Sequence, residues 1–170
     1  MLGLYDNFPE DIHRTGNFSS SLSIPKLQQR IVRVLHEVNR KPFCFGNINL
    51  PSLHGCTVIF EVGIAENKSF NFIDDQEAIK VLKALRNQAS QVLDFFVAIR
   101  YYKGTAQEKK PLRFDYYMLR SIFSQKNLVE LQVFHERGPR YVSPEELINI
   151  VEKEVNGIST RKILKKIEPS

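Results

Sequence analysis

The stretch CTVIFEVGIAENKSFNFI, residues 56–73, decides the fold class of this chain. Apolar side chains recur at every second position over residues 56–64, which is the period of a β-strand with one buried face. After a short polar segment, a second strand begins at Ser69 and places Phe70 and Phe72 on one face. Strands joined by so short a connection pair antiparallel, so the stretch predicts a β-hairpin.

Further strands are predicted toward the C-terminus by the same alternation. They cover residues 95–102, 112–118 and 129–134. Each is bounded by a polar or glycine-containing segment, which favours short antiparallel connections over crossovers. The segment 1–22 reads as an extended arm or an edge strand, because its serine run has no apolar face.

Helices are predicted between these strands. The apolar spacing of residues 27–38 gives one buried helix face. Asp74 with Glu77, and Ser143 with Glu146, match the capping box that begins a helix, and the first of these helices is expected to carry its buried stripe as far as Leu93. A short basic helix is expected within residues 158–170.

Together these elements predict a single α+β domain over residues 1–170. Its antiparallel sheet is expected to contain about five to six strands, with three to four helices packed mainly on one face. A chain of this length buries enough surface to fold without disulfides. Only two cysteines occur among the 170 residues and no long apolar run, so we expect a soluble cytoplasmic protein with no membrane partner.

Charge gives a weak indication of partners. The formal net charge is +5, but the basic residues are spread along the whole sequence. A charge spread in this way bears on solubility more than on nucleic-acid binding.

Familiar catalytic and metal-binding motifs are missing from the sequence. Cys44, His54 and Cys56 offer three soft ligands, but their spacing is poor for zinc, and Cys56 falls on the apolar face of its strand. Cys44 is a possible nucleophile within the long connection of residues 41–55, if a base lies near it. We predict no cofactor and no metal.

The segment FHERGPRY, residues 134–141, is the most concentrated polar stretch. His135 can act as an acid or base near neutral pH, and Arg137 and Arg140 can hold an anionic group by forked hydrogen bonds. Glu145 and Glu146 begin the next helix and oppose an anion there. A structural turn is the alternative interpretation.

The outer sheet face is the second candidate. We expect the core to lie under Val97, Ile99, Phe114, Tyr116, Leu131 and Val133. Basic and aromatic side chains would then project from the other face: Arg100, Tyr102, Arg113, Tyr117 and Phe134. Such a mixture can stack bases and hold phosphates. Acidic residues on the same face allow cross-strand ion pairs instead.

These sites lead to three hypotheses about function. The first is a non-catalytic binding module for RNA, DNA or another anionic partner. The second is an enzyme or small-molecule-binding domain that holds an anionic substrate at the turn of residues 135–140. The third is a subunit that self-associates or joins a protein partner through the outer sheet face.

Overall fold

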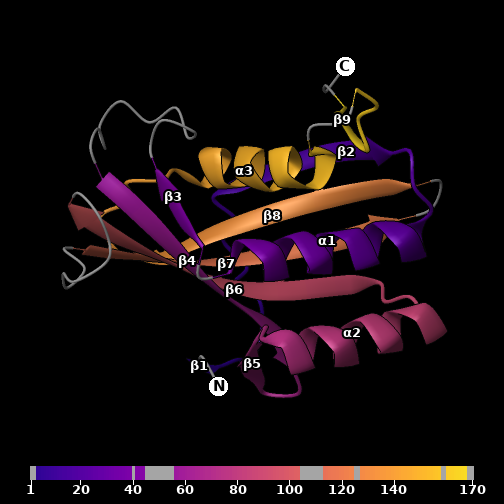
Figure 1. Ribbon diagram of the computed structural model, residues 1–170, viewed down its shortest axis with the longest axis horizontal. Coiled ribbons are helices and arrows are strands. Elements are labelled where there is room, and N and C mark those ends of the chain that lie inside the picture. The colour runs from indigo at the N-terminus through magenta and orange to yellow at the C-terminus, as the bar shows by residue number, and fades with distance from the viewer. Residues whose placement is uncertain are drawn as a thin grey trace.

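The computed structural model describes residues 3–39, 41–44, 56–103, 113–124, 127–157 and 160–167. Within these ranges the chain forms one antiparallel sheet with three helices packed against it, which confirms the α+β class (Figure 1). The helices are α1 (Ile24–Val38), α2 (Asp75–Asn87) and α3 (Pro144–Asn156). The strands are β1 (Gly3–Leu4), β2 (Arg14–Ser20), β3 (Pro42–Cys44), β4 (Cys56–Glu66), β5 (Ser69–Phe72), β6 (Val92–Lys103), β7 (Arg113–Ser124), β8 (Leu128–Arg137) and β9 (Leu164–Lys166).

The strand order places β1 and β9 at opposite edges of the sheet. The order is β1-β5-β4-β6-β7-β8-β2-β9, and β3 pairs with β4 beside this path. The predicted hairpin is present as β4 and β5, which face each other from Gly63–Phe72 to Glu66–Ser69. The long strands β4, β6, β7 and β8 form the centre, where neighbouring strands pair along most of their length.

One face of the sheet carries the main core beneath the helices (Figure 1). Alternate residues of β4, β6 and β8 point to it, as their period of two predicts. A buried Gln28 joins α1 to the start of β6, because its side chain exchanges hydrogen bonds with the backbone of Ser90. The helix-facing core includes Phe18, Ile31, Val58, Val62, Phe95, Val97, Ile99, Leu119, Leu131, Val133, Leu147 and Val151.

The predicted helix starts are confirmed by their hydrogen bonds. The Asp74 side chain accepts from the Glu77 amide at 2.8 Å. Ser143 and Glu146 form both bonds of a capping box, at 3.1 and 2.9 Å. Such caps satisfy backbone donors that the first helical turn leaves open.

Two predicted helical segments are strands instead. The expected basic helix within 158–170 is wrong, because residues 164–166 form β9 and pair with β2. Leu164 is the buried residue of this short strand, and its neighbours Lys165 and Lys166 are exposed. The α2 helix ends at Asn87, so Val92 and Leu93 belong to β6 and not to the helix stripe. Strand pairing satisfies the backbone groups of both segments. The strands with which they pair are distant in sequence, so local apolar spacing does not reveal them.

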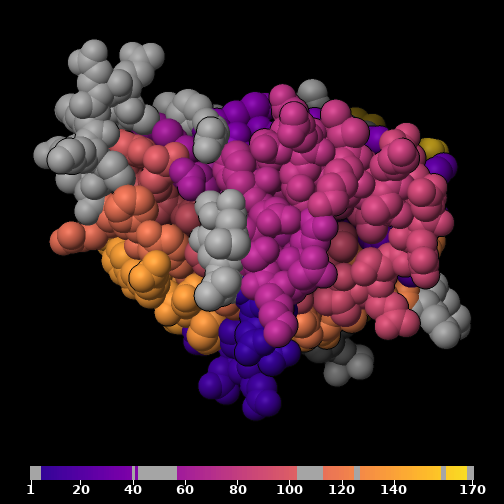
Figure 2. All heavy atoms as spheres, turned by 90° about the horizontal axis from the view of Figure 1, so that it is seen from below, coloured from indigo at the N-terminus to yellow at the C-terminus, as the bar shows by residue number. Residues whose placement is uncertain are grey.

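The N-terminal segment covers part of the other sheet face. After β1 pairs with β5, the chain crosses the sheet and returns as β2 beside β8. Tyr5, Phe8 and Phe70 form a second small core there, with Ile12 packed against it. In Figure 2 this indigo segment projects from the side of the sheet that the helices leave open. We call residues 5–12 the crossing arm. Among the described helices, none is long and apolar enough to cross a membrane.

Candidate functional site

The two faces of β7 are the reverse of the prediction: the side chains expected on the outer face point to the helices, and those expected in the core lie on the open face. Tyr117 is fully buried beneath the helices, so its predicted place on the outer face is wrong. Arg113 lies at the same parity of the strand as Tyr117, whereas Phe114 and Tyr116 lie on the open face. The crossing arm covers part of that face, so apolar residues on both sides of β7 are stabilised.

Asp115 is the centre of a buried polar cluster on the helix-covered face. Its side chain is fully buried and accepts four hydrogen bonds. The Tyr101 hydroxyl donates at 2.6 Å, and His135 Nε2 lies 2.8 Å away. The backbone amides of Arg140 and Tyr141 donate at 2.7 and 2.9 Å. Two carboxylate oxygens offer about four acceptor positions, so the hydrogen-bonding capacity of Asp115 is filled.

The turn of residues 138–142 is shaped around this carboxylate. Gly138 has φ +114°, and a Cβ there would overlap the Phe114 carbonyl oxygen. Arg140 also has positive φ, +61°. The Tyr117 hydroxyl donates to the Val142 carbonyl oxygen. Burial, as the main cause, raises the pKa of both Tyr101 and Tyr117, so these phenols remain neutral donors. The cluster therefore anchors the turn that precedes α3.

The three side chains expected to hold an anion at this turn do not converge. His135 contacts Asp115 on the helix-covered face, with its side chain only 8% exposed. Arg137 instead lies with its guanidinium 4.2 Å from the centre of the Tyr116 ring, on the open face. Arg140 contributes its backbone amide to Asp115. This geometry favours the structural interpretation of the turn.

Aromatic rings form a connected row on the open face. Phe96 and Tyr116 have ring centres 5.8 Å apart, and Tyr116 stacks on Phe114 at 6.1 Å with nearly parallel planes. Phe114 remains 38% exposed. The Arg137 guanidinium packs over Tyr116, the middle ring. We call these four side chains the aromatic row.

A second stacked pair lies beside the row, where the crossing arm meets β8. The ring of His13 stacks on Phe134 at 4.7 Å, with an interplanar angle of 11°. Burial, followed by the nearby Arg140 and His135, holds the pKa of His13 below its usual value. The neutral imidazole is therefore favoured near neutral pH, and its stacking on Phe134 resembles that of another aromatic ring.

Ion pairs border the open face. Arg100 pairs with Glu61 across β4 and β6 at 2.6 Å, and its Nε is buried with no hydrogen-bond partner within the described ranges. Asp94 binds Arg120 through two oxygens, at 2.8 and 2.9 Å. The Tyr5 hydroxyl donates to the same aspartate and so fastens the crossing arm. Tyr102 is buried, so of the predicted outer-face residues only Arg100 and Phe134 are partly accessible there.

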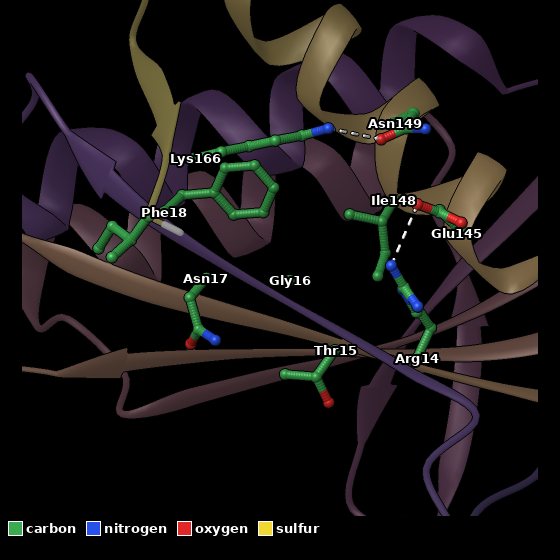
Figure 3. Close-up of a pocket in the computed structure, with 10 residues that line it drawn as sticks. Arg14, Thr15, Gly16, Asn17, Phe18, Glu145, Ile148, Asn149 and Lys166 are labelled. Carbon is green, nitrogen blue, oxygen red and sulfur yellow. Dashed lines mark hydrogen bonds and ion pairs between the residues drawn. The ribbon is translucent and has the colours of Figure 1, made fainter. Parts of the chain in front are cut away.

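A groove lies on the other side of the molecule, between β2, α3 and β9 (Figure 3). Its volume is about 520 Å³. Arg14 reaches Glu145 across one end at 3.1 Å, and Lys166 reaches Asn149 across the other at 3.3 Å. Gly16 lies between these two bridges (Figure 3). Sequence reasoning missed this groove because its walls come from three distant segments.

The proposed cysteine sites lie largely outside the described structure. His54 falls in an undescribed range, and the side chains of Cys44 and Cys56 are not placed. Across the residues that are placed, no group of three or more His, Cys, Asp or Glu side chains is arranged to hold a metal ion.

Comparison with known proteins assigns no role to these sites. No family model, curated protein or solved structure matches the chain.

Proposed function

We propose that this protein is a non-catalytic binding module that takes single-stranded nucleic acid, RNA or DNA, on the aromatic row of its open sheet face. The single observation that carries the proposal is the row itself, in which Phe96 and Phe114 lie on either side of Tyr116 and the Arg137 guanidinium packs on that middle ring. Bases stack on aromatic rings whatever their sequence, and arginine adds contact with both base and phosphate.

The exposure of the row supports binding over a purely structural role. Phe114 is among the few large apolar side chains that are exposed in the described structure. The nearby Arg100 has a buried Nε without a partner in the described structure, although its guanidinium pairs with Glu61. Arg100 pairs directly with Phe114 across β6 and β7, so its partly exposed guanidinium adds positive charge beside the row.

The filled hydrogen bonds at Asp115 weigh against an enzyme at the turn. A general base needs a free acceptor within reach of a substrate proton. The Asp115 oxygens already accept from Tyr101, His135 and two backbone amides. The binding hypothesis therefore has better support than the hypothesis of an anionic substrate at residues 135–140.

The test is fluorescence anisotropy with labelled single-stranded oligouridine over about 50–300 mM salt. Phe114→Ala should weaken binding about 5- to 150-fold, since a base stacked on an aromatic ring contributes about 1–3 kcal/mol. The matched control is Tyr141→Ala, because Tyr141 has the same 38% exposure but packs on Tyr101 near the buried cluster. Equal loss in both variants, or none in either, would contradict the proposal.

Salt dependence gives a second, independent readout. Arg137→Ala should reduce the slope of log affinity against log salt by about 0.7, the value for one phosphate contact with a single strand. Arg86→Ala on α2 is the control and should leave the slope unchanged, because Arg86 is exposed on the helix side of the molecule. If sedimentation instead shows a dimer that Phe114→Ala dissociates, the row is a self-association surface.

A further inference from the structure

The outer edge of β2 is only partly covered by β9. Strand pairing between them spans Phe18 to Ser20 of β2. The last hydrogen bond along this edge runs from the Ile167 amide to the Asn17 carbonyl oxygen, at 2.9 Å. The N-terminal half of β2 pairs with β8 on its inner side, starting at Arg14. Among the residues that the structure describes, no strand pairs with its outer side, which is therefore a strand edge.

The direction of the backbone groups along this edge follows from the bonds that flank it. Asn17 accepts from Ile167, and the Ser21 amide donates to Ile163 on the same outer side. Backbone groups alternate in direction along a strand, so Thr15 points its N–H and C=O outward as well. Within the described ranges, neither Thr15 group has a backbone partner, and nor does the Asn17 amide. Unpaired groups of this kind are a template for another strand.

The groove runs beside this edge, on the face that carries α3. Thr15 and Asn17 point their side chains away from α3, whereas Arg14 and Lys166 reach toward it (Figure 3). Gly16 contributes no side chain to the groove, but Ile148 Cγ2 and Phe18 Cε2 each lie 3.0 Å from the place of its missing Cβ, so the open volume lies beside Gly16, toward the strand edge. A residue of an added strand opposite Gly16 would place its side chain in this space, because directly paired residues share a face.

We propose that this edge binds an extended peptide segment of a protein partner, which adds to the sheet as a strand and places an acidic side chain in the groove opposite Gly16. Main-chain bonds to Thr15 would hold the peptide, and the groove would select its side chain, as in other complexes formed by strand addition. The site therefore recognises an extended backbone first and a side chain second.

The charge of the groove favours an acidic side chain. Among the described residues that line it, there are two cations, Arg14 and Lys166, and one carboxylate, that of Glu145. Arg14 and Glu145 are both more than half exposed, so their ion pair is weak and can open for a competing carboxylate. Lys166 is also more than half exposed, and its 3.7 Å contact with Glu152 leaves it close to the groove.

The test uses labelled six-residue peptides with the wild-type protein, followed by fluorescence anisotropy. The probe is N-acetylated Asp-Thr-Val-Thr-Val-Thr, which begins opposite Gly16 because Ile167 already occupies the edge at Asn17, and its twin has Lys in place of Asp. A third peptide is N-methylated at the Thr after Asp, which faces Thr15 when Asp lies opposite Gly16. We expect the Asp peptide to bind at least about 10-fold more tightly than either variant, since each lost hydrogen bond or charge contact contributes about 1 kcal/mol or more.

Two protein variants locate the binding at the strand edge. Thr15→Pro removes the outward N–H and should abolish binding, and proline is tolerated at strand edges. Thr15→Val keeps the N–H and should bind within about twofold of wild type, since only the side chain on the other face changes. Both variants should bind oligouridine normally, because Thr15 is not part of the aromatic row and β8 lies between β2 and β7, so failure here is distinguishable from failure of the proposed function.

Several results would overturn the inference. These are equal binding of the Asp and N-methylated peptides, equal binding by Thr15→Pro and wild type, and no binding at 1 mM peptide. A concentration-dependent dimer that Thr15→Pro dissociates would assign the edge to a second copy of the chain. If Thr15→Pro fails to fold, the comparison of the Asp and N-methylated peptides on wild-type protein still decides the question.

Discussion

Two aspartates on the neighbouring strands β6 and β7 each hold a distant segment of the chain, on opposite faces of the sheet. Asp115 is fully buried and binds two backbone amides of the turn before α3. Asp94 keeps 11% exposure and binds only side chains, those of Arg120 and Tyr5. Main-chain partners fix the path of the backbone, whereas side-chain partners fix a segment that can detach while the sheet persists.

The difference also separates the charges of the two sites. Arg120 neutralises Asp94 with two nearly parallel hydrogen bonds. Within the described ranges, Asp115 has no arginine or lysine side chain among its hydrogen-bond partners, and it is bound by neutral donors and His135. The buried site therefore depends more heavily on complete hydrogen bonding.

The largest expected effect is that of Asp115→Asn. The amide would turn an N–H toward at least one of the four donors and leave buried groups unpaired. We expect a loss of about 3–5 kcal/mol in the free energy of unfolding, measured by urea denaturation, as for other broken buried charge networks. Asp94→Asn is the matched control and should lose less, since its site is partly exposed. Equal losses would remove the distinction between the two anchors.

A smaller effect is expected from Gly138→Ala, which strains the turn while keeping the Asp115 carboxylate, although the added Cβ would also meet Asp115 Oδ1. The added Cβ would overlap the Phe114 carbonyl oxygen, and alanine disfavours φ +114°. We expect a loss of about 2–3 kcal/mol in the free energy of unfolding, the scale of a strained backbone position. Gly157→Ala is the control: its φ is +63°, but the nearest neighbouring atom would be 3.4 Å from the new Cβ. Its backbone strain alone should cost about 1–3 kcal/mol, because φ +63° with ψ −156° is a conformation that essentially only glycine adopts, and Gly138→Ala should lose more than this control.

The fold class could be predicted from the sequence because its main signals are local. Alternation over residues 56–64 and the capping residues Asp74 and Ser143 depend on near neighbours in the chain, and the structure contains each of these elements. The segment at 164–166 could not be read in this way. Its strand exists because the β2 edge is available, and strand order is a property of the whole sheet.

The side-chain faces of β7 show a second limit. Phe114, Tyr116 and Met118 form the more apolar set, so alternation places them in the core. The crossing arm packs against Met118 on the open face, which lets that face be apolar too. Asp115 is the residue of this strand that could have indicated the opposite assignment of faces. A carboxylate is stable inside a core when hydrogen bonds satisfy it, so its presence within a strand is compatible with a buried polar cluster. Burial of both strand faces removes the contrast on which alternation depends.

The smallest effect concerns the crossing arm and its pH dependence. Tyr5→Phe removes the hydrogen bond to Asp94 and should cost about 1 kcal/mol of unfolding free energy near pH 8. Burial, then the bond to Asp94, raises the pKa of Tyr5 to about 12. An unfolded tyrosine ionises near pH 10. Between these values the unfolded chain releases a proton that the folded chain keeps, so the contribution of Tyr5 is present below pH 10 and is lost as the pH rises through 12.

The difference between wild type and Tyr5→Phe isolates this group, because Tyr101 and Tyr117 titrate equally in both proteins. We expect the advantage of wild type at pH 8 to shrink at pH 11 in urea denaturation. Hydrogen exchange gives the local readout, since the Tyr5 amide donates to the Lys68 carbonyl oxygen at 2.8 Å. Its protection should fall in the variant while amides of β7 keep theirs. Loss of protection in both places would mean that the arm and the sheet unfold together, and that Asp94 is as integral to the fold as Asp115.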